Sequence, residues 1–300
     1  MQRRNNRRLT SLTNFKLKDN IINSCKMAMV FPELFAKMSC NNAKISKVLL
    51  EKYRHLVNFV KNPSILEYGF AGGENSEYSL RPLLPHDYKE FIAVDISEPM
   101  VEHARKNAKI PRSKFYCLDT SSPDLPEMFQ NRFDNVFSFM TIHLIKDPRQ
   151  TFTNTFRMLK DGGETFQTFY KHTPCDEVFV KLSQHPKWGK GKYNQTKMLH
   201  PYYDKPEPKE YFVADLKAAG FKKIEYMEEK MSYNFKNEEQ LKGLYLSVNT
   251  TLPHIPAEEL EEYKKDYVRE VRSMYTVCEP ENEPNHLVKP VELTVVWAKK

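Results

Sequence analysis

The chain has 300 residues, of which 40% are hydrophobic and 28% are charged. These are globular values, so the chain can bury a large core and wholesale disorder is excluded. No stretch approaches the roughly 18 consecutive apolar residues that a membrane-spanning helix needs. We therefore expect one large domain, residues 29–300, and a cytoplasmic location.

Most of the net charge of +7 lies in an N-terminal extension, residues 1–28. Seven basic residues and one acidic residue fall within the first 29, which leaves the rest nearly neutral and argues against nucleic acid as a partner. The extension is rich in Arg with interspersed Ser and Thr, as in transit peptides for mitochondrial import. The alternative is an upstream start or an uncleaved arm, because Met27 and Met29 precede the first predicted element.

Helical and strand patterns alternate from residue 41 to residue 170. Short runs of β-branched and aromatic residues predict strands, and apolar residues at helical spacing predict helices between them. This alternation indicates right-handed βαβ units around a mostly parallel sheet. The predicted helices span 41–62, 76–84, 99–109 and 149–159, and the predicted strands span 65–69, 90–95, 114–119, 133–139 and, after a turn at 161–163, 164–170.

The pattern changes after residue 171, where a proline-rich segment predicts a cap over the sheet. A later strand and the terminal strand lie far apart in sequence, which suggests an antiparallel hairpin interrupted by a helical insertion. We predict an α/β fold with a seven-stranded, mostly parallel sheet, an antiparallel last strand and a helical cap. The cap segments are 171–208 and 236–288, with helices at 209–219 (ending at Gly220) and 257–275, and with strands at 221–235 and 291–298.

Glycines cluster at the end of the first predicted strand: Gly69, Gly72 and Gly73 are three of only nine in the chain. Such a cluster lets the backbone turn sharply and lets a ligand approach without a Cβ in the way. Asp95 ends the second predicted strand, 22 residues after Gly73. An acidic side chain there can accept two hydrogen bonds from ribose hydroxyls, so a nucleoside ligand is favoured over a simple tight turn.

The spacing of these glycines distinguishes two kinds of adenosine ligand. A nicotinamide-binding Gly-x-Gly-x-x-Gly loop would place Ala71 and Glu74 at its second and third glycines, and Glu74 would repel a diphosphate. The register acidic-x-Gly-x-Gly-x-Gly, here Glu67, Gly69, Ala71 and Gly73, departs only at Ala71. That register is typical of Rossmann-like, class I S-adenosylmethionine-dependent methyltransferases. We therefore predict S-adenosyl-L-methionine, which carries no phosphate, as the cofactor.

Residues after the second and third predicted strands complete the predicted cofactor site. Asp119 stands where such enzymes commonly have an acidic residue that binds the adenine amino group. A turn-capping aspartate before Ser121 is the alternative. Ile96 and Thr120, which adjoin Asp95 and Asp119, are assigned to the same site.

The segments FSFMTIHLIKDPRQTF (137–152) and DISEPMVEHARKNA (95–108) resemble the juvenile hormone acid methyltransferase family of arthropods. The resemblance covers roughly residues 31–299 and implies methyl transfer to the carboxylate of a small hydrophobic acid, a sesquiterpenoid such as farnesoic or juvenile hormone acid. In that family a glutamine in the N-terminal helix and a tryptophan after the fourth-strand histidine help to seat the carboxylate. The matching positions here are Asn42 and Leu144, and both differ.

Methyl transfer to a carboxylic acid needs no general base, because an acid with a pKa of about 4 is already ionised at neutral pH. The sequence has no outstanding Ser-His-Asp pattern, no HExxH and no metal-ligand cluster, so no metal is predicted. His143 could donate to the acceptor carboxylate or pack against the cap; with Asn42 and Leu144 it forms the predicted catalytic set. Two alternatives stay open: a methyltransferase-like binding protein without turnover, and an O- or N-methyltransferase for another small molecule, which would need a base.

Overall fold

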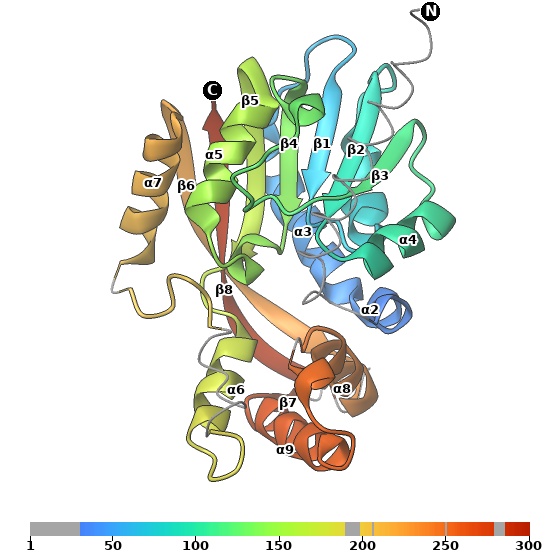
Figure 1. Ribbon diagram of the computed structural model, residues 1–300, viewed down its shortest axis with the longest axis vertical. Helices are drawn as coiled ribbons and strands as arrows, with labels where there is room; N and C mark the ends of the chain where they lie inside the picture. Colours follow the sequence, from blue (N-terminus) through green and yellow to red (C-terminus); the bar gives the residue numbers. More distant parts are fainter. Residues whose placement is uncertain (1–30, 190–198, 206, 250, 279–285) are drawn as a thin grey trace, which may run out of the picture.

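The computed structural model describes residues 31–189, 199–205, 207–249, 251–278 and 286–300. The predicted basic extension, residues 1–28, lies outside the described residues. Within them, one mixed sheet has the strand order β3-β2-β1-β4-β5-β8-β6, with β7 paired only to β8 (Figure 1). The strands are β1 Ser64–Tyr68, β2 Glu90–Asp95, β3 Ser113–Cys117, β4 Phe133–Phe139, β5 Leu159–Tyr170, β6 Lys223–Phe235, β7 Thr276–Cys278 and β8 His286–Lys299.

The first five strands are parallel, and β8 lies antiparallel between β5 and β6. The predicted antiparallel last strand is therefore confirmed. The prediction of seven strands is wrong by one, because the three-residue β7 pairs with the far end of β8. Its residues are all exposed, so no alternation of buried and exposed side chains marked it as a strand.

Two hydrophobic layers cover the two faces of the sheet. Successive residues of β1 point to opposite faces, so Ile65 packs in one layer and Leu66 in the other. Residues of α3 and α4 join the first layer, and residues of α5 and α7 join the second. The helices are α2 Pro32–Met38, α3 Cys40–Lys52, α4 Glu98–Asn107, α5 Pro148–Met158, α6 Pro174–Ser183, α7 Pro208–Ala219, α8 Glu238–Ser247 and α9 Leu260–Ser273.

Three predicted elements differ from the structure. The helix predicted at 41–62 ends at Lys52, where Tyr53 leaves the helical conformation; a 3-10 turn and then the extended, buried Val57 follow. The helix predicted at 76–84 is a π-helical turn followed by a 3-10 turn, since Pro82 has no N–H to continue the ladder. The turn predicted at 161–163 is part of β5, where Gly162 takes a positive φ beside a register shift.

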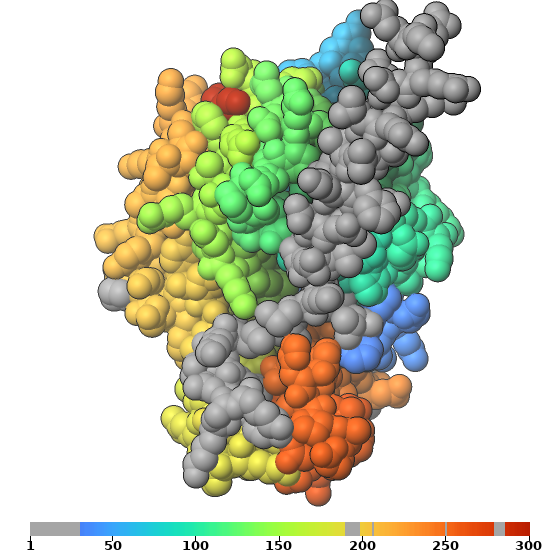
Figure 2. All heavy atoms as spheres, in the orientation of Figure 1, coloured from blue at the N-terminus to red at the C-terminus, as the bar shows by residue number. Residues whose placement is uncertain are grey.

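The helices α6, α8 and α9 form the cap, which β6 and β8 reach by extending beyond the rest of the sheet (Figure 1). The space-filling view shows α6 in yellow and α9 in orange gathered at one end of the molecule (Figure 2). Gly243 of α8 lets the cap approach α2 closely, because a Cβ there would lie 2.9 Å from Met38 Cγ. Among the described helices, none has the length and apolar character to cross a membrane.

Candidate active site

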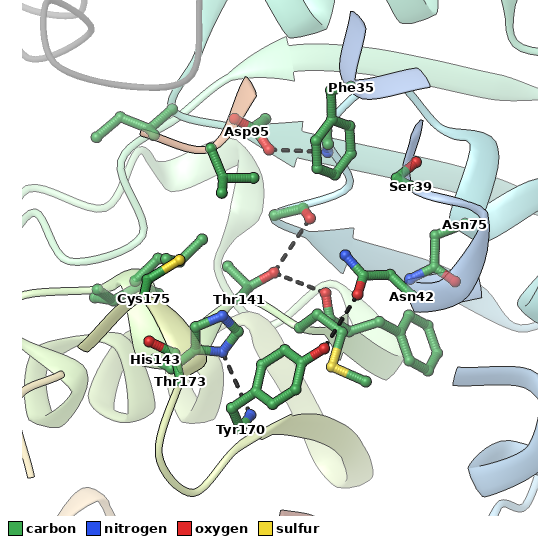
Figure 3. Close-up of a pocket in the computed structure, with 18 of the residues that line it drawn as sticks. Phe35, Ser39, Asn42, Asn75, Asp95, Thr141, His143, Tyr170, Thr173 and Cys175 are labelled. Carbon is green, nitrogen blue, oxygen red and sulfur yellow. Dashed lines mark hydrogen bonds between the residues drawn. The ribbon is translucent and has the colours of Figure 1, made fainter. Parts of the chain in front are cut away.

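A cavity of about 520 Å³ lies between the carboxyl ends of the parallel strands and the cap (Figure 3). Its walls come from the ends of β1, β2 and β4, from α2 and α3, and from α6 and α8. Parallel sheets bind ligands at this position. Nine of the residues predicted for the site line the cavity, and Glu67 and Gly73 do not: the nine are Asn42, Gly69, Ala71, Asp95, Ile96, Asp119, Thr120, His143 and Leu144.

The loop after β1 turns through left-handed backbone conformations. Gly69 has φ +69° and Gly73 has φ +97°, as glycines readily do. A Cβ on Gly69 would lie 2.2 Å from Thr141 Oγ1, so this position also requires a glycine for space. Ala71, the departure from the glycine pattern, has φ +52°, which is strained for any residue with a Cβ.

Asp95 holds this loop in place from the end of β2. Its Oδ2 accepts a hydrogen bond from the Ala71 N–H at 2.9 Å, and its Oδ1 accepts one from the Ser97 N–H at 2.8 Å. Burial raises the pKa of Asp95, and these backbone donors oppose that rise. Each carboxylate oxygen keeps a second lone pair, and the residue lines the cavity. Asp95 therefore has a structural role, and its contact to a ribose remains a prediction.

Glu67 lies beneath the loop rather than in the cavity. Its side chain is 1% exposed, and its Oε2 has no hydrogen-bond partner among the described residues. Burial raises the pKa of Glu67 to about 8, and the nearby charge of Asp95 acts in the same direction. The carboxyl group is therefore largely protonated at neutral pH. Glu67 was predicted as part of the cofactor motif, but it does not line the cavity, and Asp95 supplies the hydrogen bond that fixes the loop.

The end of the cavity beside the loop after β1, where the cofactor is predicted to bind and which we call the cofactor end, is acidic. Glu74, Asp95 and Asp119 all line it, and Glu74 pairs with His103 at 3.1 Å. Three carboxyl groups are compatible with a ligand that has a cationic sulfonium and no phosphate, and they would disfavour a dinucleotide. Phe70 packs its ring against Phe115 with centroids 5.4 Å apart. The cavity beside it therefore stays open.

Asp119 and Thr120 follow β3 at the same end of the cavity. Asp119 Oδ1 accepts hydrogen bonds from the Ser121 backbone N–H at 2.9 Å and from the Ser121 hydroxyl at 2.6 Å. This is the turn-capping arrangement that sequence reasoning kept as an alternative. Asp119 is half-buried and lines the cavity, so the role in adenine binding remains a prediction.

Asn42 presents hydrogen-bond donors to the cavity from α3. Its Oδ1 accepts hydrogen bonds from the hydroxyls of Tyr170 at 3.3 Å and Tyr233 at 2.8 Å. Figure 3 shows the amide nitrogen pointing away from the Tyr170 hydroxyl. Among the described residues, no hydrogen bond occupies Nδ2. The oxygen of this amide is thus bonded to the protein, whereas its N–H groups have no partner within the described part of the chain.

His143 presents a second donor, from the 3-10 turn after β4. Its Nδ1 accepts a long hydrogen bond of 3.4 Å from the Tyr170 backbone N–H, so the proton of the neutral ring lies on Nε2. Burial holds the pKa of His143 well below its usual value, and the neighbouring His200 lowers it further. The ring is therefore neutral at physiological pH. Nothing in the described part of the chain bonds to Nε2, which can donate to a ligand in the cavity.

Leu144, the third predicted catalytic residue, lies at the rim of the cavity with 55% of its side chain exposed. A leucine offers no polar atom, so it can shield the cavity but cannot bind a carboxylate. Tyr170 and Tyr233 are site residues that sequence reasoning missed. The position of Tyr170 at the end of a predicted strand was a usable signal, whereas Tyr233 reaches the site only through the cap strand β6.

Side chains from α6, from α8 and from the residue after α8 add apolar surface to the wall of the cavity, and no prediction assigned them to the site. They are Cys175, Phe179, Leu244, Tyr245 and Val248.

The strand order, the antiparallel β8 and the cavity at the strand ends define a class I methyltransferase fold of the Rossmann-like type. Residues 66–166 match a family model described as a methyltransferase domain. The YcgJ protein of Bacillus subtilis shares the fold with a TM-score of 0.53 and 16% identity, over 86% of this chain and 98% of that chain. A protein from Bacillus halodurans shares it with a TM-score of 0.51 and 16% identity, over 84% of this chain and 98% of that chain.

Two relatives extend the likeness over most of the chain. The juvenile hormone acid O-methyltransferase of Bombyx mori is 29% identical over 243 residues, which cover 81% of this chain and 86% of the relative. The enzyme of the same name from Drosophila melanogaster is 26% identical over 259 residues, which cover 85% of this chain and 87% of the relative. The predicted fold and the predicted resemblance are confirmed. The findings support an S-adenosylmethionine-dependent methyltransferase with S-adenosyl-L-methionine as its cofactor.

Proposed function

We propose that the chain methylates the carboxylate of a small hydrophobic acid, of the kind represented by farnesoic acid and juvenile hormone acid. The observation that carries this proposal is the pair of donors in the cavity. Asn42 Oδ1 and His143 Nδ1 both accept hydrogen bonds from the protein, which leaves Nδ2 and Nε2 to face a ligand. A group that meets only donors must be an acceptor, and a carboxylate accepts at both oxygens.

The same geometry disfavours acceptors that must lose a proton. A phenol or an amine would need a general base beside the transferred methyl group. His143 is the imidazole in the cavity, but its Nε2 carries a proton and therefore cannot accept another. A carboxylate is already ionised at neutral pH and is itself the nucleophile. The chemistry then requires alignment and exclusion of water more than proton transfer.

The cofactor supplies an activated methyl group when it is bound. The loop from Gly69 to Gly73 and the Asp95 carboxylate would hold its nucleoside at the ends of β1 and β2. Asn42 and His143 would orient the acceptor carboxylate toward it, since all these residues line one cavity. The apolar side chains that α6 and α8 contribute to the cavity would hold the hydrocarbon chain of the acid.

The proposal is tested with labelled S-adenosylmethionine and a panel of fatty and terpenoid acids that includes farnesoic acid. We expect label in a base-labile methyl ester for the wild-type protein. The matched variant is Asn42→Asp, which keeps two oxygens for the tyrosine hydroxyls but replaces the donor by an anion. It should lower kcat/KM for acids by about 100-fold or more through charge repulsion and the lost donor, and leave cofactor affinity within about twofold.

Two results would count against the proposal. The first is cofactor binding without ester formation from any acid, which would favour the binding-protein alternative. The second is an Asn42→Asp variant that methylates acids as fast as the wild type, because a carboxylate cannot bind beside an added negative charge without loss.

A further inference from the structure

Two tyrosines that lie far apart in sequence converge on the amide of Asn42. Tyr170 is the last residue of β5, and Tyr233 lies two residues before the end of β6. Their rings are perpendicular, with centroids 6.1 Å apart, and both hydroxyls donate to Asn42 Oδ1. One side-chain oxygen therefore satisfies two buried hydroxyl groups.

This arrangement fixes which end of the amide faces the cavity. Tyr170 and Tyr233 are both buried, and burial raises the pKa of each hydroxyl, so both remain protonated donors. An amide turned by 180° would present N–H groups to the two hydroxyls and take away their acceptor. Leaving a buried hydroxyl hydrogen without an acceptor is costly. The observed orientation, with Nδ2 toward the cavity, is therefore the stable one.

We propose that Tyr170 and Tyr233 are positioning residues that make the acceptor site selective for a carboxylate by holding the Asn42 amide with its N–H groups outward. This inference rests on the proposed function and deepens it. If the amide turned, Oδ1 would repel a carboxylate and would accept a hydrogen bond from a neutral primary amide instead. The two hydroxyls thus control selectivity through the amide oxygen to which both donate.

The packing of Tyr233 ties this selectivity to the cap. Its ring packs edge-on against Phe235, with centroids 5.0 Å apart. Phe235 in turn packs against Tyr245 of α8 at 6.2 Å and against Tyr275, just after α9, at 5.5 Å. The position of the Tyr233 hydroxyl therefore depends on the docking of the cap onto β6.

The test compares two ligands of the same shape, farnesoic acid and its primary amide, in Tyr170→Phe, Tyr233→Phe and the double variant. The primary amide is measured as a competitive inhibitor of farnesoic acid methylation. Tyr226→Phe is the matched control, because Tyr226 lies on the same strand and its hydroxyl pairs with Thr294 outside the cavity. Cofactor affinity and cooperative unfolding confirm that each variant is folded.

We expect the wild type to prefer the acid over the amide by at least about tenfold. In the double variant KM for the acid should rise about tenfold, the inhibition constant of the amide should fall or stay constant, and kcat should change less than about threefold. The ratio of affinities for the acid and the amide would then approach one. A merely structural role of the two tyrosines would instead weaken the binding of both ligands alike. Tyr226→Phe should keep the wild-type preference.

An undiminished preference for the acid in a folded double variant would overturn the inference while leaving the proposed function intact. Should the double variant not fold, the two single variants decide, and an unchanged preference in both overturns the inference. A wild-type protein that neither methylates farnesoic acid nor prefers it to the amide would instead overturn the proposed function, and the inference with it.

Discussion

Gly69 and Thr141 meet across the ends of β1 and β4, so closely that a Cβ on Gly69 would lie 2.2 Å from Thr141 Oγ1. Thr141 in turn donates a hydrogen bond to the Gly69 carbonyl at 3.2 Å. The loop that borders the cofactor end of the cavity is therefore braced from β4. This contact explains why the first glycine of the motif has no substitute here.

Gly69→Ala should lower the free energy of unfolding by about 2–4 kcal/mol and weaken S-adenosylmethionine binding. The added methyl group must displace Thr141, and the left-handed backbone adds about 1–2 kcal/mol of strain. Gly162→Ala is the control, because Gly162 also has a positive φ but nothing lies within 4 Å of its added Cβ. Chemical denaturation and calorimetric titration measure both quantities. Equal losses of stability in the two variants would show that the Thr141 contact is unimportant.

Ala71→Gly should raise the free energy of unfolding by about 0.5–1 kcal/mol. Ala71 has φ +52°, and removing its Cβ relieves strain that exceeds the added entropy of the unfolded chain. Ala214→Gly, at an exposed position inside α7, should instead lower stability by about 0.5–1 kcal/mol. Denaturant titration measures the free energy of unfolding of both variants. If Ala71→Gly destabilised the protein as much as Ala214→Gly, the backbone at Ala71 would not be strained.

Glu67 should make the protein less stable as the pH rises from 4.5 to about 8. Below 4.5 the carboxyl group is protonated in both states. Between 4.5 and the folded pKa of about 8 only the unfolded chain loses the proton, which costs about 1.4 kcal/mol per pH unit. Above about 8 both states are ionised and the loss is complete. Glu67→Gln removes this contribution. The free energy of unfolding of the variant should therefore exceed that of the wild type by an amount that grows with pH across this window. A pH-independent difference would be inconsistent with a buried, protonated Glu67.

His200 should make the protein less stable as the pH falls from 6.5 to about 4. Burial lowers the pKa of His200 from 6.5 to about 4, with a further contribution from His172. Below pH 6.5 the unfolded chain gains a proton that the folded chain refuses, so stability falls until the pH reaches about 4. His200→Gln should flatten this part of the stability profile while the contribution of His143, which has the same sign, remains. If thermal unfolding of the two proteins shifted equally between pH 6.5 and 4, His200 would not be buried as a neutral ring.

The sequence predicted those parts of the fold that depend on local patterns. The strands β1, β2 and β4 follow from largely buried runs, and Gly220 ends α7 with φ +113°, as its position after the helical pattern indicated. Gly69 after β1 and the acidic residue that ends β2 both line the cavity at the end where the cofactor is predicted to bind. These features are encoded by neighbouring residues, so a single sequence suffices to find them.

The acceptor end of the cavity could not be predicted in the same way. Its arrangement depends on Asn42, Tyr170 and Tyr233, which come from α3, β5 and β6. Only tertiary packing brings them together, and the direction of the amide depends on hydrogen bonds between distant segments. The exposure of Leu144 at the rim was also beyond prediction, because apolar residues after a strand are usually buried.

The most direct test of the central claim is the product ratio in a reaction of purified protein with S-adenosylmethionine and farnesoic acid. Mass spectrometry of the mixture should find methyl ester and S-adenosylhomocysteine in equal amounts, both accumulating over many turnovers and both falling together in the Asn42→Asp variant. Formation of S-adenosylhomocysteine with the methyl group on any atom other than a carboxylate oxygen, or no product at all from a protein that binds the cofactor, would contradict it.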